Sequence, residues 1–527
     1  MAIRRGPWIW LLSGLLAGVV ISLAIVAATV PLSSDALRHR IVEELSRRLN
    51  ADIELGDLDL KIFPRLRATG ASLTVRQHGS AGEPLISVRR FVIDADLAGI
   101  VRKHVSHVQL AGLRIVIPPN KPGHDPPDAP DPVATSGNDS SSLQREIVVD
   151  VLESDEAQLV TLPDAKDAHE GKQPRVWAIH KLKMRNVGAA TAMPFDATLT
   201  NAVPPGEIVT TGRFGPWHTD EPGATPLQGN FAFDRADLGV FHGIAGILTS
   251  RGQFVGSLDY ILADGEADVP NFTVTLGGQP FALHTKYHTA IDGMNGDTYL
   301  KKVEASFLQS TLVATGSVFN DTEHLSGRYV QLDITMDRAR IEDVMKMAVK
   351  STQPPMTGAL RLRTKFLLPP GETDVSDRLH LDGTFSIAGA RFTNVDVQSK
   401  IRELSAKSQG KDVEEIKGRV LSNFQGRFAL GNGRLALPQL TFTVPGAQIE
   451  LAGAYALKPE SLDFKGTMLM DATVSQTQRG WRRVMLKMID PLFRRKDGKE
   501  GSAIPFRIAG KRSDPKFGLD YRRVFKR

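Results

Sequence analysis

Residues Phe424–Asp471 decide the fold, and they read FQGRFALGNGRLALPQLTFTVPGAQIELAGAYALKPESLDFKGTMLMD. Apolar and polar residues alternate along four runs, which are separated by GNG at 431–433, PG at 445–446 and KPE at 458–460. Because successive side chains of a strand point to opposite faces, each run predicts a strand with one apolar and one polar face. The separators are turn sequences at hairpin spacing. The stretch therefore predicts an antiparallel meander with a continuous apolar surface.

The same alternation recurs upstream, for example where Leu360, Leu362 and Phe366 alternate with Arg and Lys. No fixed repeat length is visible, which argues against a propeller or a short-period solenoid. A long twisted sheet with one apolar face must curl, pair with another layer or be covered. The predicted fold class is mainly β: an N-terminal transmembrane helix, then a long, twisted antiparallel sheet curled into a groove, with a few short amphipathic helices. We expect those helices at 35–49, 341–348, 397–408 and 476–492.

The N-terminus contains a candidate membrane span. Residues 6–34 carry no charge, and the 24 residues from Pro7 to Val30 are mostly apolar. As a helix they would measure roughly 36 Å, enough to cross a bilayer core of about 30 Å. Arg4 and Arg5 precede them, which predicts a cytoplasmic N-terminus. A cleaved signal peptide is the alternative, but the run is longer than a typical signal core and lacks a clean small-x-small site before Pro31. The sequence favours a single-pass anchor.

Charge is concentrated at the other end of the chain. The 527 residues carry a net charge of +6, yet residues 479–527 alone carry 16 Lys/Arg and 5 Asp/Glu, so the first 478 residues sum to −5. This asymmetry indicates either an anionic partner or a solvated basic face. No RNA-binding signature accompanies it, so we expect no nucleic acid. The helix predicted at 476–492 either caps the sheet or lies on an anionic membrane surface. Candidates for that surface contact are Arg479, Arg482, Arg483 and Lys487.

These signals divide the chain into six parts. A cytoplasmic tail at 1–6 and a transmembrane helix at 7–30 are followed by a helix plus β section at 31–118. The stretch 119–145 is rich in Pro, Asp, Ser and Gly, which predicts a disordered loop or linker. An elongated β-groove section occupies 146–475, and 476–527 holds the basic amphipathic helix and the C-terminal strands.

Motifs at both ends of the chain resemble those of a known family. The order of apolar run, helix ending RLN at 48–50, GDLDLKIFP at 56–64 and GASL at 70–73 resembles the N-terminal region of the AsmA family. The segments GTF at 383–385, GARFT at 389–393, KIRELS at 400–405, IPFRIAG at 504–510 and DPKF at 514–517 are similar to its C-terminal region. These motifs are structural rather than catalytic, so the resemblance concerns the fold more than the substrate.

The resemblance implies a location and a function. Members of the AsmA family, like their bridge-like relatives TamB and YhdP, are linked to lipid transport and outer-membrane homeostasis. We therefore expect a protein of the bacterial inner membrane with its bulk in the periplasm. Its expected function is to provide a hydrophobic β-groove for phospholipid transfer toward the outer membrane, supporting the cell envelope. Expected partners are phospholipid acyl chains, the inner membrane through residues 7–30, and other envelope proteins.

The apolar face is the candidate functional site in either of two hypotheses. In the first it is an open groove for acyl chains. In the second the protein is a periplasmic scaffold or outer-membrane protein assembly factor, whose apolar face is a closed core and no lipid conduit. The candidate groove lining consists of apolar residues on predicted strands: Phe254, Leu258, Phe272, Val274, Phe385, Ile387, Phe428, Phe442, Ile449 and Phe464.

Signals for catalysis are weak. The chain contains no cysteine, which excludes disulfides, cysteine nucleophiles and Cys-based zinc sites. Walker, dinucleotide-binding, HExxH and GxSxG motifs are absent from the sequence. His284 and His288 have the spacing of a helical metal pair, but they fall in an alternating run and are better explained as the polar face of a strand. His104 and His107 are interpreted as surface residues. We expect no enzymatic activity, no cofactor and no metal.

Overall fold

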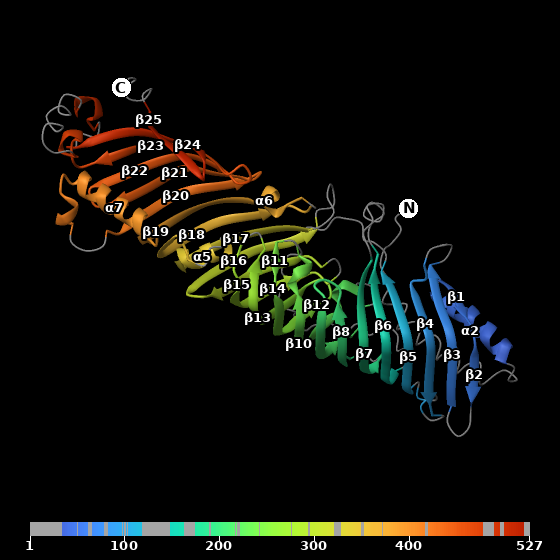
Figure 1. Ribbon diagram of the computed structural model, residues 1–527. Coiled ribbons are helices and arrows are strands. Elements are labelled where there is room, and N and C mark those ends of the chain that lie inside the picture. Colours follow the sequence, from blue (N-terminus) through green and yellow to red (C-terminus); the bar gives the residue numbers. More distant parts are fainter. Residues whose placement is uncertain are drawn as a thin grey trace. The chain divides into compact units, whose positions relative to one another are not determined.

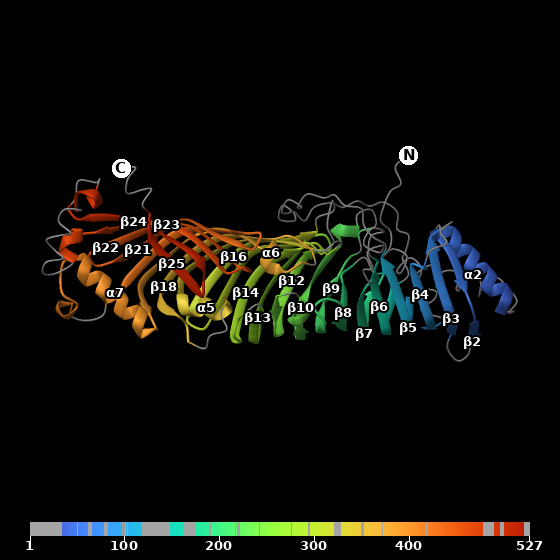
Figure 2. The same ribbon diagram turned by 45° about the horizontal axis from the view of Figure 1, so that its top comes forward.

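The structure is a computed structural model (Figures 1 and 2). It describes residues 34–49, 51–61, 66–77, 83–96, 99, 102, 104–117, 148–162, 174–188, 191–216, 218, 222–241, 243–275, 277–293, 296–320, 328–348, 353–371, 373–416, 420–477, 490–495 and 500–520. The predicted tail, membrane span and linker, and most of the helix predicted at 476–492, lie outside these ranges. No helix within these ranges is long and apolar enough to cross a membrane.

Strands dominate the described chain, as predicted, and all 25 of them belong to one sheet. The chain divides into two compact units. Unit 1 comprises Met1–Val240, Ile247–Ala267 and His288–Thr298, and unit 2 comprises Phe241–Gly246, Asp268–Tyr287 and Tyr299–Arg527. The strands β13 (Ile261–Val274), β14 (Phe281–Ile291) and β15 (Thr298–Phe307) contribute to both units.

Unit 1 begins with the helix predicted at 35–49 and continues as a meander. Apart from the three shared strands, its elements are α2 (Ser34–Leu49), β1 (Ala51–Leu55), β2 (Leu58–Lys61), β3 (Leu66–Gln77), β4 (Ile86–Ala95), β5 (His104–Ile117), β6 (Val148–Thr161), β7 (Arg175–Val187), β8 (Met193–Asn201), β9 (Gly206–Phe214), η1 (Pro222–Ala224), β10 (Pro226–Asp237), η2 (Leu238–Val240) and β12 (Ile247–Ser257).

One strand pair of unit 1 departs from the predicted antiparallel order. β3, β4 and β5 pair antiparallel in succession, as do β6 to β10, but β5 and β6 pair in parallel. A hairpin loop of two to five residues forces an antiparallel pair, whereas a connection of a dozen or more residues permits a parallel one. Residues 118–147 separate β5 from β6, so the chain length between them allows the exception.

The first strands of unit 1 enclose a core. Ile41 of α2 is 1% exposed and belongs to a cluster of buried side chains from β1 to β8. Val75, Val88 and Val108 of this cluster are 0–4% exposed. At this end of the sheet the apolar face is therefore a closed core.

Unit 2 is built from strands with three α-helices between them in the described part of the chain. Its elements are β11 (Ile244–Ala245), β16 (Ser310–Asn320), β17 (Arg328–Arg340), α5 (Ile341–Ala348), β18 (Met356–Leu368), α6 (Val375–Arg378), β19 (His380–Phe392), α7 (Val395–Ser408), η3 (Val413–Glu415), β20 (Ser422–Gly431), β21 (Arg434–Val444), β22 (Ala447–Ala456), β23 (Ser461–Met470), η4 (Val474–Thr477), η5 (Asp490–Phe493), β24 (Ser502–Lys511) and β25 (Asp514–Leu519).

The stretch that decides the fold forms the predicted hairpins. β16 to β25 pair antiparallel with each neighbour in chain order. Asn432 and Gly433 both have positive φ between the paired residues Gly431 and Arg434, as a two-residue type I′ turn requires. Gly446 has a φ of +83° after Pro445, as in a type II turn. The sequence between Phe424 and Asp471 therefore specifies both its strands and its turns.

Candidate functional site

Cross-strand register gathers apolar side chains on one face of unit 2, called here the apolar face. Residues directly opposite each other on neighbouring strands share a face, so each register line defines a row. One row is Leu360, Ile387, Phe424, Phe442, Ile449, Met468 and Ile504. The next is Leu362, Phe385, Gly426, Leu440, Leu451, Gly466 and Phe506. A further row contains Leu381, Leu430, Leu435, Tyr455 and Leu462. No charged residue interrupts these rows.

Two helices cover one edge of the apolar face. Ile341, Val344 and Met347 of α5 pack against a cluster that includes Leu360 and Ile387. α7 contributes Ile401 and Leu404 to a second cluster, which includes Phe442, Val444 and Ile449. Figure 2 shows α5 and α7 along the same edge of the strands. The row nearest this edge is thus part of a local core.

A buried carboxylate holds α5 in place. Asp343 is 5% exposed and accepts hydrogen bonds from the Gln309 backbone N–H at 2.9 Å and the Ser310 hydroxyl at 2.8 Å. The turn between β15 and β16 is thereby fixed to the helix. A buried carboxylate without such donors would be strongly destabilising. The position of α5 over the apolar face therefore does not depend on apolar contacts alone.

The opposite ends of the same strands carry an ion-pair cluster. Lys458, in the turn between β22 and β23, lies 2.5 Å from the Asp377 carboxylate and 3.2 Å from that of Asp374, beside α6. The hydrogen bond to Asp377, with a smaller contribution from Asp374, raises the pKa of Lys458. All three side chains are well exposed, so this cluster contributes little stability.

Most of the predicted groove residues meet on the apolar face of unit 2. Phe385, Ile387, Phe428, Phe442, Ile449 and Phe464 all lie on it. Phe385, Phe428 and Ile449 are half-buried. Ile387 is only 6% exposed, and Phe442 and Phe464 are only 8% exposed. The predicted lining therefore contains both partly open positions and closed ones.

The other four predicted lining residues lie outside these rows. Phe272 of β13 belongs to the α5 cluster, with its ring centroid 5.5 Å from that of Phe281. Val274 lies opposite Ile244 on β11 and is half-buried. Phe254 is in β12 of unit 1, and Leu258 follows the end of that strand in a turn, where its N–H donates to the Thr225 carbonyl. The structure thus does not gather all ten residues at one site.

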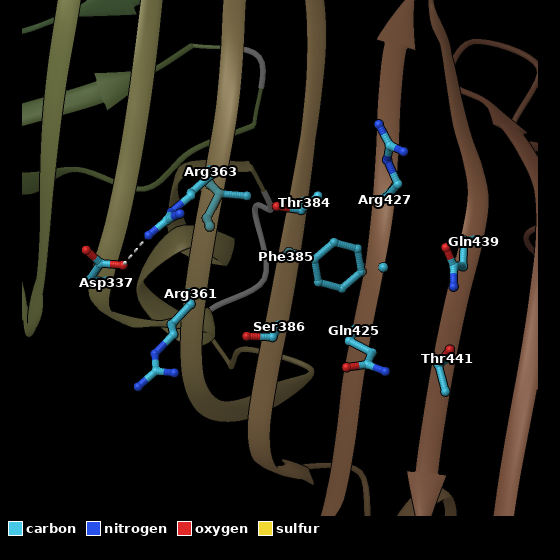
Figure 3. A pocket seen from close by; sticks show the side chains of 12 residues that line it. Asp337, Arg361, Arg363, Thr384, Phe385, Ser386, Gln425, Arg427, Gln439 and Thr441 are labelled. Atoms are coloured by element: carbon cyan, nitrogen blue, oxygen red, sulfur yellow. Dashed lines mark ion pairs between the residues drawn. The ribbon is translucent and has the colours of Figure 1, made fainter.

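Phenylalanine rings lie across glycines of the neighbouring strand, an arrangement called here a Phe–Gly pair. Without a Cβ, glycine leaves room for a ring to lie flat on the sheet, as Figure 3 shows for the Phe385 ring directed toward β20. The pairs in unit 2 are Phe385–Gly426, Phe464–Gly453 and Phe506–Gly466, and those in unit 1 are Phe91–Gly70, Phe195–Gly212, Phe231–Gly252 and Phe254–Gly229. The rings therefore lie flat and form part of the surface of the apolar face instead of projecting from it.

Replacement of a paired glycine is expected to strain the sheet. A methyl group at Gly466 would lie 2.6 Å from the Glu450 carbonyl oxygen and 2.8 Å from Phe506 Cζ. We expect Gly466→Ala to lower the free energy of unfolding by roughly 1–3 kcal/mol, the usual cost of overpacking. Urea unfolding followed by circular dichroism measures it. Gly518→Ala is the matched control, because nothing lies within 4 Å of the added methyl group. Equal effects of the two changes would contradict the Phe–Gly pair as a packing unit.

The histidines take the surface positions predicted for them. His284 Nδ1 lies 2.7 Å from Asp268, and His288 Nδ1 lies 2.7 Å from Asp264. All four side chains are at least 38% exposed. His104 and His107 of β5 meet Asp150 and Glu153 of the parallel strand β6, at 3.0 and 3.2 Å. Within the described ranges no group of three or more His, Asp or Glu side chains is arranged to hold a metal ion.

Sequence reasoning missed three features of the sites. It did not place α5 and α7 on the apolar face, because helix positions relative to a sheet depend on distant contacts. Acidic partners of His104 and His107 were missed because β6 is 46 residues away in sequence. The Phe–Gly pairs leave only a weak signal in the sequence, because the strand register decides which glycine lies opposite which aromatic residue. The predicted surface contacts Arg479, Arg482, Arg483 and Lys487 lie outside the described residues.

The fold and the site define the class of protein: a mainly β chain on one large sheet, with an uncharged apolar face flanked by helices in unit 2. Comparison with protein-family models, curated proteins and solved structures finds no match to this chain. The resemblance to the AsmA family therefore rests on the sequence motifs and stays a prediction.

Proposed function

We propose that the protein holds lipid acyl chains on the apolar face of unit 2 and passes them along it. The observation that carries this proposal is that uncharged apolar rows continue across β18 to β24, while α5 and α7 contact only one edge of them in the described chain. Leu440 and Leu451 of the next row remain half-buried rather than closed, and Phe385 of that row, also half-buried, packs against the α5 cluster. Partly accessible apolar side chains of this kind are stabilised when an apolar occupant covers them.

The dimensions of the face suit acyl chains. Strands are about 4.8 Å apart, so the seven strands β18 to β24 span roughly 30 Å across the rows. Burial of acyl methylenes contributes about 0.8 kcal/mol each, so a few of them in contact with the rows hold a chain. No single residue needs to dominate such binding.

The membrane context of the proposal comes from the sequence. The predicted span Pro7–Val30 would anchor the chain in the inner membrane, and the AsmA resemblance supports a periplasmic location for the sheet. Transfer of phospholipid toward the outer membrane is the function that follows. No catalytic step is required of the protein, because lipid moves along the face without covalent change.

A scaffold function is the second candidate, and one observation favours it. The apolar face of β1 to β6 in unit 1 is a closed core, with side chains such as Val75 and Val108 at 0% exposure. If the same were true of unit 2 in solution, the protein would bind partner proteins through its edges rather than lipid. The two functions differ in whether the uncovered rows contact lipid.

Site-specific photocrosslinking tests the proposal. Leu440 lies on the apolar face and its neighbour Gln439 on the polar face of the same strand. A benzophenone amino acid at position 440 of the full chain in cells is expected to crosslink phospholipid, detected by mass spectrometry, and one at position 439 is expected not to. Crosslinks to protein alone from position 440 would favour the scaffold, and equal lipid crosslinking from both positions would contradict a lipid-binding face.

A further inference from the structure

A hollow lined mostly by polar side chains lies over β17 to β21 of unit 2, with Leu362, Phe385 and Gly426 of one apolar row also among its lining residues (Figure 3). Its volume is about 420 Å³, within the range of roughly 300–1,000 Å³ typical of ligand sites. Two register lines supply its side chains. One contains Arg361, Ser386, Gln425 and Thr441, and the other contains Arg363, Thr384, Arg427 and Gln439.

Cationic groups exceed acidic ones in this hollow. Three guanidinium groups line it, with Asp337 as the single carboxylate among the lining residues. Arg363 Nη2 lies 4.0 Å from Asp337, and both side chains are largely exposed. Arg361 and Arg427 form no ion pair or hydrogen bond with the residues that the structure describes. Each guanidinium has five N–H donors and no acceptor, so two sets of donors face solvent ready for anionic oxygens.

The excess of positive charge is local. The next register line toward the strand ends contains Asp333, Lys365 and Asp382. These three side chains carry a net charge of −1, which offsets part of the positive charge of the hollow. Long-range attraction of any anion is therefore weak at this face. Recognition has to come from the guanidinium donors inside the hollow and from the hydroxyl and amide groups between them.

The spread of these groups excludes a compact anion as the best ligand. Four strands at about 4.8 Å spacing distribute the side chains over roughly 14 Å. Figure 3 shows Arg361 and Arg363 on one strand and Arg427 two strands away, with Thr384 and Ser386 on the strand between them and Gln425 on the strand of Arg427, and the three guanidinium groups do not converge on one point. A ligand that satisfies this array carries acidic groups at intervals, with hydroxyl groups between them.

We propose that this hollow binds an acidic oligosaccharide, with sugar carboxylates on Arg361, Arg363 and Arg427 and sugar hydroxyls on the Ser, Thr and Gln side chains. Planar carboxylates match the two-pronged geometry of a guanidinium, and hydroxyl and amide side chains exchange hydrogen bonds with sugar hydroxyls in both directions. This proposal does not rest on lipid binding, because the expected ligand contacts are the polar side chains of two register lines, although Leu362, Phe385 and Gly426 of one apolar row also line the hollow.

Unit 1 contains a natural control for this site. A hollow of about 450 Å³ on the polar face of β9, β10, β12 and β13 is lined by similar amide and hydroxyl side chains, including Thr211, Gln228 and Asn230. Its only charged lining residues are Arg213 and Asp264, and Asp264 is paired with His288. One cation is matched by one carboxylate there, so this hollow has no excess of guanidinium donors.

Binding of a tetragalacturonate to the purified full chain, measured by isothermal titration calorimetry, tests the proposal. We expect the double variant Arg361→Gln/Arg427→Gln to weaken binding at least tenfold, and Arg213→Gln to leave it unchanged. All three arginines are exposed, and circular dichroism is expected to show the fold of each variant intact.

Two further probes decide the chemistry. Neutral maltotetraose is expected to bind at least tenfold more weakly than tetragalacturonate, and inorganic phosphate is expected to show no binding that the double variant removes. Equal binding of the neutral sugar, phosphate binding lost in the double variant, or tetragalacturonate binding that is absent or insensitive to Arg361 and Arg427 would each overturn the assignment.

Discussion

Leu451→Asp is expected to reduce lipid crosslinking from position 440 at least tenfold while the protein stays folded. Leu451 lies directly opposite Leu440 on the apolar face, and it is half-buried. A carboxylate at this position remains hydrated. An acyl chain that crosses it therefore loses apolar contact and must desolvate the charge, at a cost of several kcal/mol. The measurement is the yield of phospholipid crosslinked to the benzophenone at 440 in cells, normalised to protein.

Ala452→Asp is the matched control for this prediction. Ala452 is the next residue of the same strand, on the polar face, exposed and opposite Lys465. The new carboxylate has a cationic neighbour there and lies away from the rows, so crosslinking is expected to be unchanged. A loss of the same size in both variants would mean that charge disturbs the strand rather than the acyl path.

Phe442→Asp is expected to unfold the region around α7 rather than to block a groove. Phe442 is 8% exposed, its ring centroid lies 4.7 Å from that of Phe424, and it belongs to the cluster with Ile401 and Leu404 of α7. Replacement removes a buried ring and leaves a carboxylate without donors, which lowers the free energy of unfolding by at least about 3 kcal/mol. Urea unfolding followed by circular dichroism measures the change.

Thr443→Asp provides the comparison for Phe442→Asp. Thr443 is the next residue on β21 and points to the polar face between Asn423 and Gln448, so we expect a change within about 1 kcal/mol. If Phe442→Asp instead left stability unchanged and removed lipid crosslinking, Phe442 would belong to an open floor, and α7 would have to leave the face in solution.

Local sequence patterns predict the strands and turns of unit 2 well. The alternation from Phe424 to Asp471 and its GNG and PG separators correspond to β20 to β23 and to the observed turns. The helices α2, α5 and α7 also form where apolar spacing predicts them. Side-chain periodicity and turn chemistry are encoded by neighbouring residues, which is why one sequence suffices to find them.

Long-range features were not accessible in the same way. Phe442, Ile387 and Phe385 carry equivalent signals in the sequence, yet helices bury the first two and leave the third half-buried. The parallel pair of β5 and β6 likewise depends on strands joined by a long connection. The arginines of the polar hollow look like ordinary solvated residues until the register of four strands brings them together.

The Phe–Gly pairs have a consequence for friction on the apolar face. A ring lying on the glycine of the next strand has few rotamers available, so the height of the floor at Phe385, Phe464 and Phe506 is fixed by the backbone. An acyl chain that slides over this surface meets only small, fixed differences in height, so its movement does not require side chains to rearrange. For the proposed lipid transfer, we expect the speed to depend on temperature mainly through the viscosity of the lipid itself.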